Sequence, residues 1–268
     1  MTDQPDWAPP DVDTKQANAA RVYDYWLGGE HNFLADQDLG RAMGAIEPSV
    51  RTITRANRAF LGRAVRFLAT TGIRQFLDIG SGIPTQANVH EVAQRAAPGS
   101  RVAYVDIDPV AVAHSKALLA GDEDTVVIAA DLREPEKILA NTTVRGLIDF
   151  REPVALLLLA VLHFISDADD PWRIVGSLRD ALTPGSYLVI SHRTDEHDRD
   201  QAAERLYNRS IATQAQARSR EAVLRMFDGF DLVAPGLVYV PAWRPGSPAD
   251  VPEDPGRFAS LGGVGHRH

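Results

Sequence analysis

The sequence predicts an α/β protein built on a doubly wound, mostly parallel β-sheet. Between residues 75 and 191, short apolar segments alternate with segments whose apolar residues recur at helical spacing. One segment, 154–161, is apolar at every position, which is typical of a central strand covered on both faces. A turn, Gly80-Ser81-Gly82, follows the first apolar segment. In such a sheet the crossovers are right-handed and ligands bind at the carboxyl ends of the strands.

Composition limits the class of protein. The 268 residues, 44% hydrophobic and 24% charged, suffice for one large domain with appendages. A net charge of −8 argues against nucleic acid as a partner, because phosphate-binding surfaces concentrate lysine and arginine. The absence of cysteine excludes disulfides and thiolate zinc sites and suits a cytoplasmic protein. Residues 1–13 do not resemble a signal peptide, and the longest apolar run, 154–162, is too short to cross a membrane.

The N-terminal part predicts a loose arm followed by three helices. Asn18 is a suitable N-cap for a helix that Gly28 and Gly29 end, and a second helix is expected over 36–46. The clearest long helix is expected over 49–71. Its arginines are interpreted as a solvated face: Arg51, Arg55, Arg58, Arg63 and Arg66. We expect residues 1–72 to form an arm and helical cap over a core of residues 73–268.

The core is expected to begin with five strands linked by helices. The strands are predicted over 75–79, 101–106, 125–130, 154–161 and 186–191. The intervening helices are predicted over 85–97, capped by Thr85, and over 109–120, 134–139 and 167–182. A helical insertion of about 199–227 should follow, with helices over 201–218 and 219–227. Late strands near 237–240 and 258–264, separated by a proline-rich loop, would complete seven strands.

Chemistry-bearing residues lie at or just beyond the ends of four of the predicted strands. They are Asp78 with the Gly80-Ser81-Gly82 turn, Asp106 with Asp108, Asp131, and His163. In a doubly wound sheet all four groups would face one crevice. Asp106 follows Gly80 at about the spacing at which an acid accepts hydrogen bonds from ribose hydroxyls. Any one of these aspartates could instead be an ordinary helix cap or turn residue.

Two kinds of nucleotide cofactor fit this pattern. A pyrophosphate dinucleotide such as NAD prefers G-x-G-x-x-G with no acid facing the phosphates. Here Thr85 replaces the last glycine, and Asp78 lies just before the first one. A carboxylate is unfavourable beside pyrophosphate but favourable beside the ammonium and sulfonium groups of S-adenosylmethionine. The pattern therefore favours the cationic cofactor and leaves an NAD-dependent oxidoreductase as a weaker alternative.

The motifs resemble those of class I S-adenosylmethionine-dependent methyltransferases. The matching stretches are Phe76-Leu-Asp-Ile-Gly-Ser-Gly82, Tyr104-Val-Asp-Ile-Asp-Pro109, Asp131-Leu132 and Leu162-His-Phe-Ile165. With Ala19-Ala-Arg-Val-Tyr-Asp-Tyr-Trp-Leu-Gly-Gly29 and Gly185-Ser-Tyr-Leu-Val-Ile-Ser-His192, nearly the whole chain is similar to an actinobacterial subgroup. The resemblance implies a Rossmann-like, seven-stranded sheet with an N-terminal helical cover and S-adenosylmethionine as cofactor. Ile83-Pro84 departs from the common pattern, in which another glycine follows the turn.

The resemblance also implies roles for individual residues. Gly80, Ser81 and Gly82 would let the backbone meet the methionyl part, and Asp78 would orient its amino group. Asp106 would bind the ribose hydroxyls and Ile107 would pack on the adenine. Asp131 and Leu132 would contact the adenine edge, and Ala160 would lie near the sulfonium. Tyr23 would cover the outer side of the cofactor.

Catalysis of methyl transfer needs a general base only when the acceptor is protonated. The first candidates are His163 and His192, at the ends of two strands, and Tyr23 and Tyr25 are the second choice. His163 could instead be a structural turn residue. The charged residues after His192 are interpreted as a solvated loop and not as metal ligands, so we predict no metal site. The hypothesis is methyl transfer to a small-molecule acceptor, without nucleic acid or membrane partners. The alternative is a cofactor-binding sensor without turnover.

Overall fold

The structure, a computed structural model, describes residues 5, 7–10, 12–85, 87–196, 201–211 and 213–268, without the side chains of residues 201–204. Its centre is an eight-stranded sheet with strand order β3-β2-β1-β4-β5-β8-β6, while β7 pairs with β8 outside this path. The strands are β1 (Gln75–Ile79), β2 (Arg101–Asp106), β3 (Thr125–Ala129), β4 (Ala155–Leu159), β5 (Tyr187–Arg193), β6 (Asp231–Leu232), β7 (Val238–Tyr239) and β8 (Ser260–His266).

The first five strands are parallel, which confirms the predicted doubly wound class. The fully apolar segment becomes β4, which lies between β1 and β5 with all its residues buried. β8 runs antiparallel to β5 along seven residue pairs, from Tyr187 and His266 to Arg193 and Ser260. The sequence analysis missed β6, because a strand of two residues carries no readable alternation.

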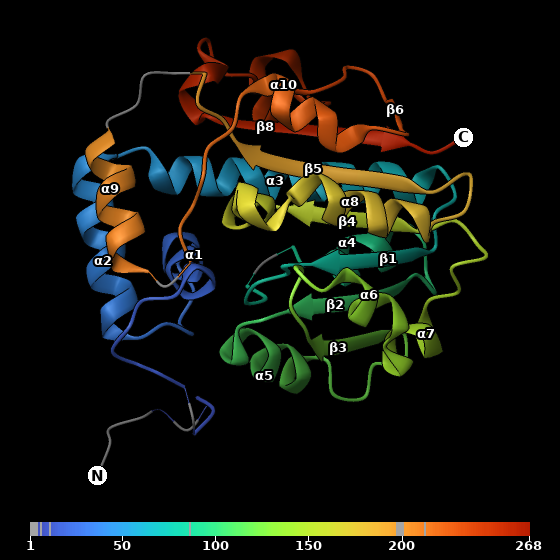
Figure 1. Ribbon diagram of the computed structural model, residues 1–268, viewed down its shortest axis with the longest axis horizontal. Coiled ribbons are helices and arrows are strands. Elements are labelled where there is room, and N and C mark those ends of the chain that lie inside the picture. The colour runs from blue at the N-terminus through green and yellow to red at the C-terminus, as the bar shows by residue number, and fades with distance from the viewer. Residues whose placement is uncertain (1–4, 6, 11, 86, 197–200, 212) are drawn as a thin grey trace.

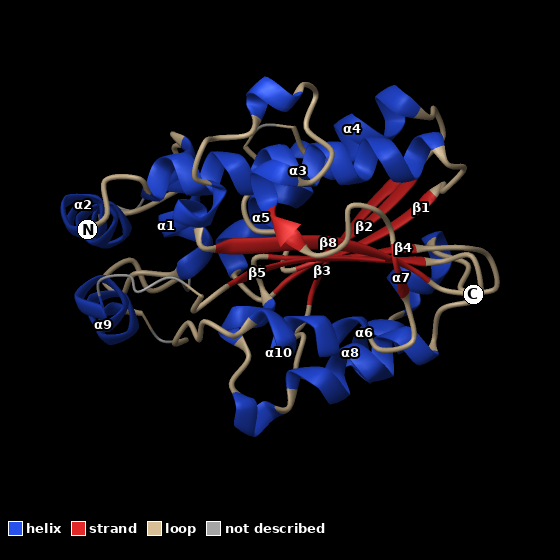
Figure 2. Ribbon diagram, turned by 90° about the horizontal axis from the view of Figure 1, so that it is seen from above, coloured by secondary structure: helices blue, strands red, loops and turns tan. Residues whose placement is uncertain are grey.

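Helices cover both faces of the sheet (Figure 2). They are α1 (Ala19–Leu27), α2 (Leu34–Ile46), α3 (Val50–Thr70), α4 (Val89–Ala96), α5 (Pro109–Leu118), α6 (Pro135–Ala140), α7 (Thr142–Leu147), α8 (Pro171–Asp180), α9 (Gln201–Ser210) and α10 (Arg220–Leu224). One apolar core joins α3 and α4 to residues such as Phe76 and Val102. A second core joins α6, α7, α8 and α10 to the opposite side chains of the same strands, such as Leu77 and Leu156.

Three helices, α1, α2 and α9, lie together beyond the carboxyl ends of the parallel strands (Figure 1). They share a small apolar cluster of their own, in which Trp26 of α1 stacks on Tyr207 of α9 with ring centroids 6.3 Å apart. α1 begins as predicted, since the Asn18 side chain accepts a hydrogen bond from the Ala20 N–H. It ends at Gly28, which has the left-handed backbone conformation of a C-cap. These helices and the N-terminal part of α3 form the helical cover.

Several predicted boundaries were wrong for identifiable reasons. Thr85 does not cap a helix: α4 begins after Asn88, whose backbone N–H bonds to Glu91 in a capping box. Of the predicted helix over 85–97, residue 86 lies outside the described part. The helix predicted over 167–182 begins only at Pro171, which starts α8 because its missing N–H costs nothing in the first turn. α9 ends at Ser210, well before the predicted 218, and α7 was not predicted. Residues 199, 200 and 212 of the predicted insertion lie outside the described residues.

Among the described residues, no helix is both long enough and apolar enough to span a membrane.

Candidate active site

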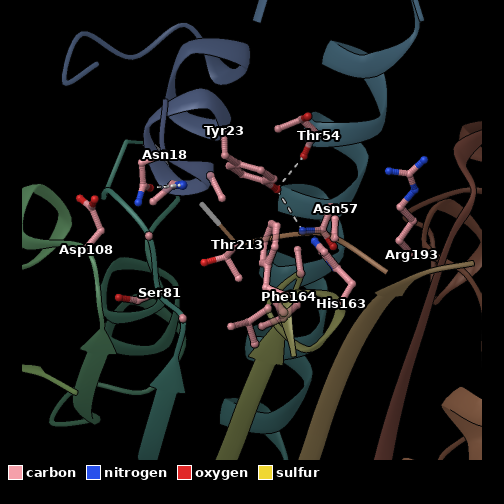
Figure 3. A pocket seen from close by; sticks show the side chains of 18 of the residues that line it. Asn18, Tyr23, Thr54, Asn57, Ser81, Asp108, His163, Phe164, Arg193 and Thr213 are labelled. Atoms are coloured by element: carbon pink, nitrogen blue, oxygen red, sulfur yellow. Dashed lines mark hydrogen bonds between the residues drawn. The ribbon is translucent and has the colours of Figure 1, made fainter. Parts of the chain in front are cut away.

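A cavity of about 360 Å³ lies where the ends of β1, β2 and β4 meet the helical cover. Figure 3 shows it between Ser81 and Asp108 on one side and His163 and Arg193 on the other, with Tyr23 above. All but one of the predicted site residues line it: Tyr23, Asp78, Gly80, Ser81, Gly82, Asp106, Ile107, Asp131, Leu132, Ala160 and His163. The exception is His192.

The glycine turn is held by backbone hydrogen bonds, and its two glycines have different surroundings. The Gly80 N–H donates to the Val105 carbonyl oxygen at 2.8 Å. A Cβ on Gly80 would lie 2.3 Å from a Val161 methyl carbon, and its φ of +76° also disfavours a side chain. At Gly82, by contrast, a Cβ would meet nothing within 4 Å. Gly80 thus packs the turn against the end of β4, whereas Gly82 leaves open space beside the backbone.

Two buried carboxyl groups, Asp78 and Asp106, lie under this turn. Burial raises the pKa of Asp78 to about 7 and that of Asp106 to about 6. Asp106 accepts a 2.7 Å hydrogen bond from the Gly82 N–H and a 2.8 Å bond from the Asp108 N–H. No described residue donates a hydrogen bond to Asp78. Asp78 is therefore the carboxyl group that would gain most from a cationic ligand group in the cavity.

The other strand-end acids have structural partners. The Asp108 side chain accepts from the Val110 and Ala111 N–H groups, so it caps α5, the alternative considered for isolated aspartates. Asp131 is paired with Arg133, whose Nε lies 2.9 Å from its Oδ2. Asp131 remains on the cavity wall, but its carboxylate is already partly neutralised.

Two apolar residues and one strained residue complete the cofactor side. Ile107 is 60% exposed although it is a large apolar residue, and it lines the cavity beside buried Leu132. Ala160 has a φ of +53°, which is uncommon for a residue with a side chain. The Ala160 N–H donates to the carbonyl oxygen and to the hydroxyl oxygen of Ser191, both at 3.0 Å, and these hydrogen bonds stabilise the strained conformation. Backbone strain of this kind clusters at ligand sites.

Tyr23 fixes the cover to the core. Its hydroxyl donates to the Thr54 carbonyl oxygen at 3.2 Å and accepts from the Asn57 side-chain amide at 3.0 Å (Figure 3). Burial raises the pKa of Tyr23, so the phenol stays protonated. Tyr25 does not line the cavity. Its ring lies against Arg51, whose Cζ is 5.0 Å from the ring centroid of Tyr25.

The two candidate histidines differ in access. Burial holds the pKa of His163 well below its usual value, and its Nδ1 has no hydrogen-bond partner in the described chain. His192 is fully buried behind it, with ring centroids 5.8 Å apart. The His192 Nδ1 bonds to the Arg193 carbonyl oxygen, and its Nε2 accepts from Arg218 at 3.0 Å. The structure thus brings His163 to the cavity and leaves His192 in a supporting position.

The sequence analysis missed Arg58, which lines the cavity from α3. It belongs to the row of arginines that we interpreted as a solvated face. Within the described residues, Arg58 forms no hydrogen bond or ion pair, and its Nε is buried. No signal in the sequence separates it from Arg51 or Arg55, since all three recur at helical spacing.

These features fit an adenosyl cofactor with a cationic end. The open space at Gly82, the exposed Ile107, the buried acids Asp78 and Asp106 and the unpartnered Arg58 all face one cavity. A carboxyl group without a donor and a guanidinium without an acceptor are the groups that a zwitterionic amino-acid end would satisfy.

Comparisons with known proteins agree with this assignment. A sequence profile described as S-adenosyl methyltransferase matches residues 5–268. The chain is similar to a solved structure from Thermobifida fusca, with 43% identity and a TM-score of 0.92 over 98% of this chain and 99% of that one. It is also similar to a DUF574 family protein of Streptomyces avermitilis, with 39% identity and a TM-score of 0.91 over 96% and 99% of the two chains.

More distant structures share the fold alone. The N-methyltransferase NodS of Bradyrhizobium japonicum, solved with S-adenosylhomocysteine, is 16% identical, with a TM-score of 0.50 over 86% of this chain and 97% of that one. No curated protein matches the sequence. The match of the family profile to nearly the whole chain, and the cavity that the motif residues line, show that this protein belongs to the S-adenosyl methyltransferase family.

Proposed function

We propose that this S-adenosylmethionine-dependent methyltransferase acts on a small-molecule acceptor that binds between His163 and the helical cover. The cofactor, when bound, supplies a methyl group activated by the sulfonium. Asp78 would hold the ammonium of the cofactor, Asp106 its ribose, Ile107 and Leu132 its adenine, and the turn Gly80–Gly82 its methionyl part. The observation that carries the proposal is a single cavity that runs from these residues to His163 (Figure 3).

The acceptor side supports a small molecule. Its walls include apolar side chains of the cover and of the segment after β4, namely Trp26, Met43, Val50, Ile53, Phe164 and Ile211. Helices α1, α2 and α9 lie over this end of the sheet, so a macromolecule would have to displace them (Figure 1). A small molecule would need only to fill the space beside them.

His163 is the residue proposed to take a proton from the acceptor. Burial lowers its pKa, so the imidazole is unprotonated and has a free lone pair, but the same shift makes it a weaker base than an ordinary histidine. Positioning and exclusion of water would supply the rest of the acceleration, since an in-line displacement needs its reacting atoms aligned.

Binding and transfer can be tested separately. Calorimetry should detect S-adenosylmethionine and S-adenosylhomocysteine but not NAD, and failure of both sulfur ligands to bind would refute the cofactor roles. Protein incubated with methyl-labelled cofactor and a cell extract should then yield a labelled small product. Asp106→Ala should abolish the labelling, whereas Arg55→Met, an exposed change on α3, should not.

A non-catalytic sensor remains the second candidate. One observation favours it: within the described residues, His163 has no carboxylate partner that would orient it as a base. A sensor would bind the cofactor tightly and transfer no label to any extract.

A further inference from the structure

The arginines of α3 have different surroundings although the sequence presents them as one set. Arg55 and Arg66 are exposed, and Arg51 lies over Tyr25. Arg63 donates hydrogen bonds to the carbonyl oxygens of Trp243 and Val240 at 2.8 and 2.6 Å. Each of these side chains therefore has solvent or a protein partner.

Arg58 has neither full solvent nor a partner. It is half-buried, it lines the cavity, and its Nε is buried without a hydrogen bond in the described chain. A buried donor that lacks an acceptor is destabilising, and more so when the group is charged. Such an unsatisfied cation, facing a cavity, indicates that an anionic group binds there.

The positive charge of Arg58 acts on two other groups of the cavity wall, Asp78 and Tyr23. Its charge lowers the pKa values of Asp78 and Tyr23, against the larger effect of burial, which raises both. Yet Arg58 and Asp78 form no ion pair within 4 Å. The cavity thus holds a cation and a carboxyl group that are near one another but do not neutralise each other directly.

The other guanidinium groups on the cavity wall are placed differently. Arg133 is bound to Asp131. Arg193 lies on the far side of His163 from Ser81 (Figure 3). Arg58 is the cavity arginine whose charge acts on Asp78.

We propose that Arg58 binds the α-carboxylate of the cofactor's methionine part, while Asp78 binds its α-ammonium. The inference rests on the proposed cofactor roles and adds a residue to them. Arginine suits this task because its planar fork matches the two oxygens of a carboxylate. The contact would also join the cofactor to α3, the helix that Tyr23 uses to hold the cover.

Calorimetry with three ligands tests the proposal at pH 8.5, where Asp78 is ionised. S-adenosylhomocysteine carries both the ammonium and the carboxylate, decarboxylated S-adenosylhomocysteine carries only the ammonium, and 5′-methylthioadenosine carries neither. Arg58→Met should weaken S-adenosylhomocysteine binding about 10- to 100-fold. It should leave the affinities of the other two ligands within twofold of wild type. Arg58→Lys should restore part of the loss, and the matched control Arg55→Met should change nothing.

Each contrary outcome has a distinct meaning. Unchanged S-adenosylhomocysteine affinity in Arg58→Met would overturn the proposal. Equal weakening of all three ligands would overturn it by showing that Arg58 only supports the cavity. Weakening that includes the decarboxylated ligand but spares 5′-methylthioadenosine would overturn it in favour of an action through Asp78. If wild type binds none of the ligands, the proposed cofactor roles fail as well.

Discussion

The two walls of the cavity are built in different ways. The strand wall is fixed by hydrogen bonds from the backbone of the glycine turn: the Gly80 N–H donates to the Val105 carbonyl oxygen and the Gly82 N–H to the Asp106 carboxylate. The helical wall is fixed by side chains that reach from one helix to another element: Tyr23 bonds to α3, and Arg21 lies between Asp36 of α2 and Asp108 before α5. The strand wall is therefore part of the folded sheet, whereas the cover depends on a few polar contacts. Substitutions in the strand wall and in the helical wall should therefore differ in their effects on stability and cofactor binding.

The largest effect is expected at Arg21, which is buried between two carboxylates. Its Nε lies 3.7 Å from Asp36 and 3.8 Å from Asp108, and all three side chains are at most 5% exposed. Arg21→Met removes the cation beside two buried carboxylates, which then keep only backbone N–H donors, and should cost about 3–5 kcal/mol of unfolding free energy. Denaturant unfolding measures this. Arg41→Met, which breaks an exposed pair with Asp38, is the control and should cost at most about 1 kcal/mol. Similar losses in the two variants would contradict the prediction.

The glycine turn should show the next largest effect. Gly80→Ala combines positive φ with a clash against Val161, so we expect a loss of about 2–4 kcal/mol. Gly82→Ala has the same backbone strain and no clash, so about 1 kcal/mol is expected. Thermal or chemical unfolding of both variants gives the comparison. If Gly82→Ala proved as damaging as Gly80→Ala, the assigned packing against β4 would be incorrect.

Asp78 should make cofactor binding depend on pH. With its pKa raised to about 7, the carboxylate needed for the ammonium forms as pH rises, so affinity for S-adenosylhomocysteine should increase about tenfold from pH 6 to 8. Asp78→Asn should flatten this profile in calorimetry. A wild-type profile that is flat, or a variant profile that is equally steep, would exclude Asp78 as the group responsible.

The same carboxyl groups should affect the stability of the cofactor-free protein. Asp78 and Asp106 have folded-state pKa values of about 7 and 6, above the ordinary value near 3.8. The folded state therefore holds more protons between about pH 4 and 7, and their contribution to stability should be full below pH 4 and lost as pH rises to 7. Unfolding of Asp78→Asn should show a smaller decline over this range than wild type. An identical decline would contradict the assignment.

The smallest effect is expected where the cover meets α3. Tyr23→Phe removes two hydrogen bonds and leaves the Asn57 amide without its acceptor, so a loss of about 0.5–1.5 kcal/mol is expected. Faster amide hydrogen exchange in α1, with β1 unchanged, would show that the cover loosens separately. Tyr187→Phe is the control, since no described residue bonds to that hydroxyl. Equal effects of the two changes would argue against Tyr23 as a link.

The sequence by itself determined the strand wall. Strands, glycine turns and helix caps depend on residues close in the chain, so the segment Phe76–Gly82 and the end of β2 at Asp106 could be predicted to line one cavity. Thr85 shows the limit of local signals: it is a good cap residue, but Asn88 with Glu91 forms the cap instead.

Only the tertiary structure decided which side chains face the cavity. Arg51, Arg55 and Arg58 have the same helical spacing, and the packing of α1 and β1 around α3 brings Arg58 alone of these three to the cavity wall. Likewise, His163 and His192 were both predicted to lie at strand ends, but both ring nitrogens of His192 are bonded, to Arg218 and to the Arg193 carbonyl oxygen, whereas His163 reaches the cavity. Such differences arise from contacts between segments far apart in the chain, which no local pattern encodes.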